Sequence, residues 1–180
     1  MDPDRRLMMK VQRHDPEAFR SLVERFGTRL YSAALRILGS HQDAEDAVQR
    51  TFLSCYAGSD GYRTEWAAST WLYRILTNQC VDELRRRAAR ERRDQAAADL
   101  LRERGAASVP GRAGDPDLRR ALARLPREAR LLVILHYSDG LSYGELARVR
   151  GISINTVRSQ LQRARALLRA HLRGRKETNA

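Results

Sequence analysis

The chain of 180 residues has little cysteine and no long apolar run. Cys55 and Cys80 lie far apart, form no C-x-x-C motif and do not cluster with histidine. This spacing argues against a disulfide framework and against a zinc site. No apolar run approaches the ~18 residues of a membrane span, and the N-terminus lacks the apolar core of a signal peptide. We therefore expect a cytoplasmic protein with half-buried thiols, no membrane insertion, no metal and no cofactor.

Lysine is also scarce, although the chain is strongly basic. Lys10 and Lys176 are the only lysines, so arginine supplies nearly all of the formal net charge of +12. Such a balance indicates a polyanionic partner, with nucleic acid ahead of an anionic membrane. The alternative is that codon usage in a GC-rich genome raises the arginine content without such a partner. With 42% hydrophobic and 31% charged residues, the composition is that of a globular protein.

Alternation of period two is missing, so strands are not expected, and apolar residues recur at helical spacing instead. Asp15-Pro16 is an N-cap followed by a first-turn proline, and it opens a helix that continues to Gly39-Ser40. The apolar stripe of that helix begins with Phe19, Leu22, Val23, Phe26 and Leu30. Two more helices are expected over Asp43–Tyr56 and from about Thr70 to Arg87, separated by the polar loop Gly58–Ser69.

The apolar pattern fades over residues 88–114. The run Arg85–Arg93 is almost entirely charged, and Gly105–Gly114 consists largely of Gly, Ala, Ser and Pro. Asp115-Pro116 then repeats the capping signal and opens a second helical block. We therefore expect an all-α chain with two small helical domains, residues 1–88 and 115–175. The linker between them, residues 89–114, is expected to be helical at its start and flexible at its end.

The second block contains a helix-turn-helix pattern over Leu141–Leu168. Ser142 and Glu145 fit a capping box, Gly151 suits the tight turn, and Ser153 can cap the next helix. Val157, Leu161, Ala164 and Leu168 form the stripe of that next helix that must face the core. The opposite face presents amides, hydroxyls and guanidinium groups, the chemistry that reads base edges in the major groove. The candidate DNA-binding residues are Asn155, Thr156, Arg158, Ser159, Gln162 and Arg163.

Residues 141–175 hold eight arginines and one acid, so this region can neutralise several phosphates. The bland interpretation of the same pattern is a solvated basic helix that touches no base.

The first block gathers aromatic residues beside a basic helix. Tyr62 and Trp66 lie in the polar loop, where we expect them to meet a partner, whereas Trp71 lies on an apolar stripe and is expected in the core. Aromatic rings beside arginines suit single-stranded DNA, because an unstacked base needs a π-face and the backbone needs cations. The candidate residues are Tyr62, Arg63, Trp66, Arg74 and Asn78.

Three carboxylates, Asp43, Glu45 and Asp46, open the helix that precedes this loop. Acids in a first turn suit the helix macrodipole, which accounts for Asp43. A metal-dependent nuclease would need them to converge, and residues 43, 45 and 46 do not share one helix face. We expect no catalytic residues. The outer face of this helix instead presents a mixed polar and acidic patch with one apolar residue: Gln42, Glu45, Asp46, Gln49 and Leu53, with Arg50 at its edge.

These blocks together resemble the extracytoplasmic-function (ECF) sigma factors of bacterial transcription. The resemblance rests on EAFRSLVERFGTRLYSAALRILG, DAEDAVQRTFLSCY and TWLYRILTNQCVDELRRR in the first block, and on LARLPREARLLVILHYSDGLSYGELARVRGISINTVRSQLQRARALL in the second. It implies a protein without catalytic activity that binds core RNA polymerase and promoter DNA, and that an anti-sigma factor commonly holds inactive. The alternative is a helix-turn-helix regulator that binds duplex DNA without docking on polymerase.

The resemblance also distributes the candidate residues among partners. The patch on Asp43–Tyr56, with Arg50 included, would dock on the clamp helices of the polymerase's largest subunit. The loop and Asn78 would capture a melted base of the −10 element, and the helix-turn-helix would read the −35 element as duplex. The loop YRTEWAAS lacks a glycine and a second aromatic that the family usually carries, so Trp66 is a candidate for the missing ring.

Overall fold

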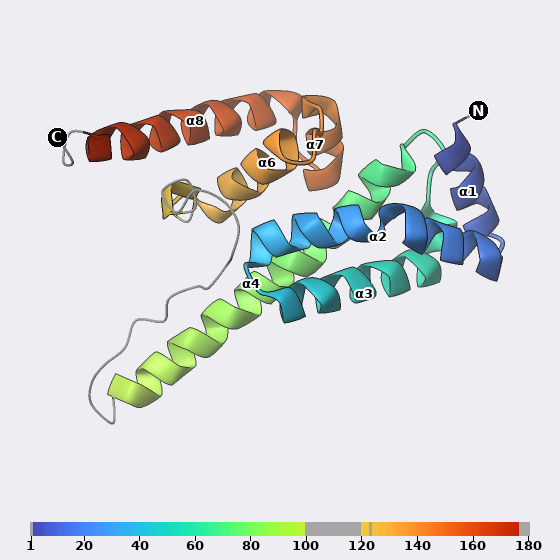
Figure 1. Ribbon diagram of the computed structural model, residues 1–180, viewed down its shortest axis with the longest axis horizontal. Helices are drawn as coiled ribbons and strands as arrows, with labels where there is room; N and C mark the ends of the chain where they lie inside the picture. Colours follow the sequence, from blue (N-terminus) through green and yellow to red (C-terminus); the bar gives the residue numbers. More distant parts are fainter. Residues whose placement is uncertain (1, 100–119, 123, 177–180) are drawn as a thin grey trace. The chain divides into compact units, whose positions relative to one another are not determined.

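The computed structural model describes residues 2–99, 120–122 and 124–176, and in these ranges it contains α-helices and a short 3-10 helix but no strand (Figure 1). The all-α fold class is thus confirmed. The chain divides into two compact units, residues 1–111 and residues 112–180.

The first unit is a bundle of α1 (Pro3–Val11), α2 (Pro16–Leu38), α3 (His41–Ala57) and α4 (Ala68–Asp99), with the 3-10 helix η1 (Ser59–Gly61) in the loop before α4. The long helix α2 packs against the other three, and α3 packs against α4. The bundle core contains the fully buried side chains of Met8, Leu22, Leu30, Leu72, Tyr73 and Leu76.

The helix boundaries in this unit follow from capping residues. The Asp15 carboxylate accepts hydrogen bonds from the N–H groups of Glu17 and Ala18, and Pro16 begins α2. Gly39 ends α2 in the left-handed conformation, with φ of 71°. Ser40 then caps α3 by accepting from the N–H of Asp43. The predicted start and end of α2 are therefore confirmed.

Helix α1 was not predicted, although its signal is present in the sequence. Asp2-Pro3 is the same pair that opens α2, and the Asp2 side chain accepts from the N–H of Asp4. Met8 and Val11 bury the inner side of this short helix. Because only two of its nine residues are buried, its apolar pattern is too sparse to show as a stripe.

Helix α4 is longer than expected. It begins at Ala68 rather than near Thr70, passes residue 88 without a break and ends at Asp99. Arg, Ala, Glu and Gln favour helix, so the helical start predicted for the linker is the continuation of α4. The segment predicted to be flexible, residues 105–114, lies outside the described residues. Val23 corrects a second expectation, since it lies at the edge of the α2 stripe and is 36% exposed.

The second unit consists of α6 (Arg127–Tyr137), α7 (Tyr143–Arg150) and α8 (Ile154–Lys176). Helices α6 and α7 both pack against α8, around the buried side chains of Leu132, Leu135, Leu146, Val149 and Leu161. The second helical block was expected to open at Asp115-Pro116. Its start lies outside the described residues, and residues 120–122 are helical.

Candidate nucleic-acid and protein interfaces

The turn between α7 and α8 has the geometry of a helix-turn-helix. The Ser142 hydroxyl accepts from the N–H of Glu145, while the N–H of Ser142 donates to the Glu145 carboxylate at 2.8 Å, which completes the capping box. Gly151 takes the left-handed conformation, with φ of 65°. The Ser153 hydroxyl then accepts from the N–H of Thr156 at 3.0 Å and caps α8. All three predicted local signals are confirmed.

Helix α8 places its predicted inner stripe inside the unit. Val157, Leu161 and Ala164 are fully buried, and Leu168 is half-buried. The opposite side is therefore free for a partner: Asn155, Arg158, Gln162 and Arg163 are exposed, and Thr156 and Ser159 are half-buried.

Four of the six candidate side chains on α8 already have hydrogen-bond partners within the helix or at its N-cap. The Ser159 hydroxyl donates to the Thr156 carbonyl at 3.0 Å, and the Thr156 hydroxyl lies 2.8 Å from that of Ser153. Arg158 donates to the Asn155 side-chain oxygen at 3.3 Å. Gln162 and Arg163 form no hydrogen bond or ion pair within the described part of the chain, so their polar groups are the freest of the set.

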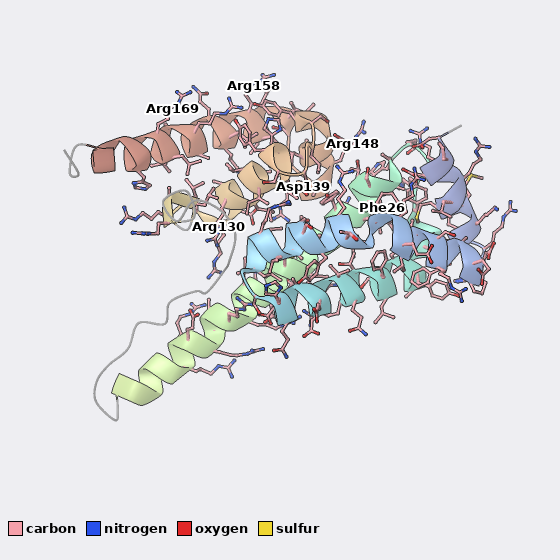
Figure 2. The ribbon with its side chains drawn as sticks, viewed as in Figure 1. Phe26, Arg130, Asp139, Arg148, Arg158 and Arg169 are labelled. Carbon is pink, nitrogen blue, oxygen red and sulfur yellow. The ribbon has the colours of Figure 1, made fainter. Side chains whose placement is uncertain are left out.

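The described arginine side chains of α7 and α8 divide into two groups. Arg150 donates twice to the Glu128 carboxylate and ties α7 to α6. Arg165 donates to the hydroxyls of Tyr137 and Tyr143, which raises the pKa of Arg165 and ties α8 to α6 and α7. Among the described side chains of α7 and α8, the exposed arginines are Arg148, Arg158, Arg163 and Arg169. Figure 2 shows Arg158 and Arg169 projecting from the same side of α8.

An apolar residue at the head of α8 escaped the sequence interpretation. Ile154 is the first residue of the helix and is 48% exposed. It lies one turn before Arg158 on the same side of the helix. An exposed isoleucine next to polar groups that suit base edges could have been found by asking which residues of the first turn lie off the inner stripe.

The aromatic loop of the first unit corrects one expectation. Tyr62 was expected to face a partner, but it is 4% exposed. Its ring packs edge-on against Trp71, its hydroxyl donates to the Trp66 carbonyl at 2.7 Å, and its own carbonyl accepts from Gln12 at the end of α1. Tyr62 therefore fixes the loop instead of presenting a ring to a ligand. Trp71, expected in the core, is half-buried against it.

The remaining residues of that group do lie at the surface. Trp66 is half-buried, and the guanidinium carbon of Arg74 lies 5.1 Å from the centroid of its ring. Arg63, Arg74 and Asn78 are exposed, and Asn78 lies one helical turn after Arg74 on α4. A ring, a cation and an amide thus share one region of this unit.

The arginine triplet that follows is occupied by ion pairs. Arg85 pairs with Asp82, and Arg86 pairs with the buried Glu83 at 3.1 Å. Arg87 pairs with Asp43 and also donates to the Leu38 carbonyl at the end of α2 at 3.0 Å. Asp43 therefore has a structural partner that its place in the sequence could not indicate.

The residues predicted to form a docking patch lie on the outer face of α3. Gln42, Glu45, Asp46 and Gln49 are exposed, and Leu53 is 61% exposed. Unlike Asp43, the acids Glu45 and Asp46 form no ion pair with any described residue. An exposed leucine beside two unpaired carboxylates is a surface suited to a protein partner rather than to DNA.

Arg50, at the edge of this patch, turns towards α4. Its Nη2 atom lies 3.7 Å from the carboxylate of Glu83, which is 5% exposed. The buried acid thus has Arg50 and Arg86 on two sides. This contact accounts for a positive charge next to an acidic face.

In the part of the chain that the structure describes, no three metal-ligating side chains come together, and none of the helices combines the length and the apolar character that a membrane span needs.

Comparison with known proteins identifies the family. The model of Sigma-70 region 2 matches residues 22–90, and that of Sigma-70, region 4 matches residues 116–168. The ECF RNA polymerase sigma factor SigM of Mycobacterium tuberculosis is 35% identical over 154 residues, covering 86% of this chain and 76% of the relative. The chain belongs to the ECF sigma factors. This sigma factor binds bacterial core RNA polymerase and directs promoter-specific initiation by recognising −35 and −10 elements.

Further relatives of this sigma factor agree. SigW of Bacillus subtilis is 29% identical over 178 residues, covering 91% of this chain and 94% of the relative. Among solved structures, CnrH in complex with the cytosolic domain of CnrY aligns with a TM-score of 0.72 and 29% identity, covering 96% of this chain and 99% of the other. RpoE of Bartonella quintana, in complex with the anti-sigma factor NepR, aligns with a TM-score of 0.66 and 28% identity, covering 86% and 96%.

Proposed function

We propose that α8 reads the −35 element as duplex DNA, with its exposed polar side in the major groove. The observation that carries this assignment is the split of α8 into a fully buried apolar stripe and an opposite side with exposed amide and guanidinium groups. Base contacts would come from Asn155, Arg158, Gln162 and Arg163. Thr156 and Ser159 contribute hydroxyl groups that lie close to the backbone of α8. Ile154 adds an apolar side chain that suits a thymine methyl group.

The surface around the η1–α4 loop is assigned to the melted −10 strand. Trp66 offers a ring on which a flipped base can stack, Arg74 and Arg63 offer cations for the backbone, and Asn78 can hydrogen-bond a base edge. Tyr62 supports this surface from below, through its hydrogen bond to the Trp66 carbonyl.

The outer face of α3 is assigned to the clamp helices of the largest polymerase subunit. Glu45, Asp46, Gln49, Gln42 and Leu53 supply the contacts, and Arg50 positions α3 against α4 through Glu83. The assignment is supported by the two unpaired carboxylates and the exposed leucine on an otherwise basic protein.

The proposed division of the chain is a polymerase-docking and −10 domain over residues 1–88, a linker over 89–114, and a −35 domain over 115–175. The protein has no catalytic activity of its own. It works in the cytoplasm, where core RNA polymerase is found.

An anti-sigma factor is proposed as a further partner. Two solved structures that align over most of this chain, those of CnrH and RpoE, each hold a second protein, the cytosolic domain of CnrY or the anti-sigma factor NepR. Co-purification of the tagged chain from its own cells, followed by a transcription assay with and without the captured protein, tests this. A captured protein that leaves transcription unchanged would contradict the proposal.

Run-off transcription on a randomised promoter library tests the main assignment. With core polymerase, the wild-type protein is expected to select templates with a fixed −35 and −10 sequence. Variants Gln162→Ala and Asn78→Ala should change preference at the −35 and at the −10 element, respectively. Tight footprints on duplex by the protein alone, without any promoter-dependent transcript, would support the conventional regulator instead.

A further inference from the structure

The basic end of α4 remains without a role in the function described above. Beyond Arg87, which is tied to α2 through the Leu38 carbonyl, α4 continues to Asp99, and Figure 1 shows this yellow-green end extending past the turn between α2 and α3. Arg90, Arg92 and Arg93 are exposed there, with Glu91 as the only acid among residues 84–93.

The positive charge of this segment is not neutralised by its own fold. The Nε groups of Arg92 and Arg93 donate to carbonyls four residues earlier, at 2.9 Å and 3.4 Å, so these side chains lie along the helix. Burial lowers the pKa of Arg87, and the nearby charge of Arg90 lowers it further while Glu91 opposes this. Arg87, Arg90 and Arg93 follow one another at intervals of three residues, and like charges at this spacing destabilise a helix. A polyanion bound to these arginines would therefore also stabilise the end of α4.

Arg92 and Arg93 lie on the same side of α4 as Asn78. At about 100° per residue, Arg92 lies about 40° and Arg93 about 60° from the direction of Asn78 around the helix axis, whereas Arg90 lies about 120° away. Arg74 and Arg85 fall on the Asn78 side as well. The side of α4 assigned to the −10 strand therefore continues as a line of arginines to the end of the described side chains.

We propose that Arg92 and Arg93 of α4 bind backbone phosphates of the promoter duplex next to the −10 element. With a rise of about 1.5 Å per residue, Arg92 lies about 21 Å from Asn78 along the helix. This distance corresponds to about six base pairs of duplex at ~3.4 Å each. The location of the contact rests on the proposed −10 assignment of Trp66 and Asn78. Contact with phosphates adds affinity without sequence preference.

The test uses the full chain bound to core polymerase and a duplex promoter fragment selected by the wild-type holoenzyme. The variant Arg92→Gln/Arg93→Gln removes both charges but keeps good helix formers. The slope of log affinity against log salt is expected to become less steep by about 2 units, at ~0.9 per phosphate contact, with the promoter preference unchanged. Arg92→Lys/Arg93→Lys should restore most of the slope.

Two controls separate a local contact from general charge. Arg13→Gln/Arg20→Gln removes two exposed charges, one from the turn after α1 and one from α2. Arg90→Gln removes one charge from the opposite flank of α4. Both variants should keep the wild-type slope. A slope that falls equally in these controls, or that stays unchanged in the Arg92/Arg93 variant, would overturn the proposal. The proposal would also be overturned if the Arg92→Gln/Arg93→Gln variant bound the promoter with normal affinity and changed only the extension of the RNA transcript.

Neutral methylphosphonate linkages locate the contact on the DNA. Placed in the duplex next to the −10 element, they should lower affinity for the wild-type holoenzyme and leave the Arg92→Gln/Arg93→Gln holoenzyme unaffected. Equal losses for both proteins would contradict the proposal. Failure of the −10 or −35 assignment would instead appear as an unchanged promoter preference in the Asn78→Ala or Gln162→Ala variant, which the salt slope of the Arg92/Arg93 variant does not report.

Discussion

Arg163 of α8 is the side chain that we expect to contact a base of the −35 element. It is exposed and has no partner within the described residues, whereas Arg158 is hydrogen-bonded to Asn155. Its planar guanidinium is therefore free to donate two hydrogen bonds to a guanine edge. We expect Arg163→Ala to cost ~1–3 kcal/mol at one position of the −35 element only. Competition binding of holoenzyme to single-base promoter variants measures this.

A different outcome would show that Arg163 contacts only phosphate. In that case every promoter would lose affinity alike, and the salt slope would flatten by about one unit. Arg169→Ala is a suitable comparison, since Arg169 is exposed on the same helix beyond the candidate base-reading residues.

Much of what is seen at single residues was predictable, and the failures have a common cause. Capping residues such as Ser142, Gly151 and Ser153 act within one turn of the chain, so the sequence alone reveals them. The burial of Tyr62 and the partner of Arg50 depend on residues of other elements, Trp71 and Glu83. No local pattern contains such contacts, so the sequence could only indicate that aromatic and charged residues were present.

At the scale of elements, α3 combines an inner side in the core with an outer side for a partner. Charge reversal by Glu45→Lys/Asp46→Lys is expected to abolish binding to core polymerase, because it places two cations on the docking face beside Leu53. Binding of −35 duplex by the same full-length protein should be spared, since α8 lies in the other unit. Affinity for core polymerase, measured by fluorescence anisotropy, checks the first part and a mobility shift the second.

The matched control for this prediction is Glu17→Lys/Glu24→Lys on α2, which alters net charge by the same amount at exposed positions. Normal core affinity in the Glu45/Asp46 variant would remove α3 as the docking element, and equal losses in both variants would indicate an effect of net charge.

The pairing of α3 with α4 depends on a buried acid. Removing Arg50 leaves Glu83, which is 5% exposed, with Arg86 alone. We expect Arg50→Ala to lower the free energy of unfolding of the first unit by about 1–2 kcal/mol, because the buried carboxylate loses one of the two cations that compensate its desolvation. Urea unfolding followed by tryptophan fluorescence reports on this unit, because Trp66 and Trp71 both belong to it.

Arg20→Ala serves as the reference for this measurement, because Arg20 and Glu17 form an exposed pair that should contribute less than ~1 kcal/mol. If Arg50→Ala costs no more than this reference, Arg50 has no role in positioning α3, and its charge belongs to the docking face.

Helix boundaries that are set by capping residues could be predicted from the sequence, and other boundaries could not. The start of α2 and the whole of α7 follow from caps and could be predicted. The end of α4 could not, because Arg, Ala and Glu favour helix without an apolar side, and an interpretation based on apolar periodicity stops where the stripe stops.

At the scale of the whole molecule, the two thiols report on the integrity of one unit. Burial raises the pKa of Cys55 to about 12 and that of Cys80 to about 12. Both are protonated and inaccessible in the folded state, so iodoacetamide at neutral pH should label them only when the first unit unfolds. Mass spectrometry after timed labelling, with and without urea, measures this. Rapid labelling of either thiol in the native protein would contradict the burial.

The raised pKa values of Cys55 and Cys80 make the stability of the first unit depend on pH. Below the ordinary thiol value of 9.0 both the folded and the unfolded states keep their protons, and stability is unaffected. Between pH 9.0 and about 12 the unfolded chain loses protons that the folded unit retains, so stability should fall as the pH rises. A Cys55→Ala/Cys80→Ala variant should show a weaker decline over this range, and an identical decline would contradict the assignment.

Helices α3 and α4 are joined side chain to side chain at three successive levels: Asp43 to Arg87, Arg50 to Glu83, and Ser54 to Gln79. Residue numbers that rise on one helix fall on the other, so these links run along an antiparallel pair. The helix proposed to bind polymerase, α3, and the helix proposed to bind the melted strand, α4, are therefore held rigidly together. The first unit then loses little conformational entropy when polymerase and DNA bind. The distance between the polymerase-binding face and the base-binding surface is already fixed in the free protein.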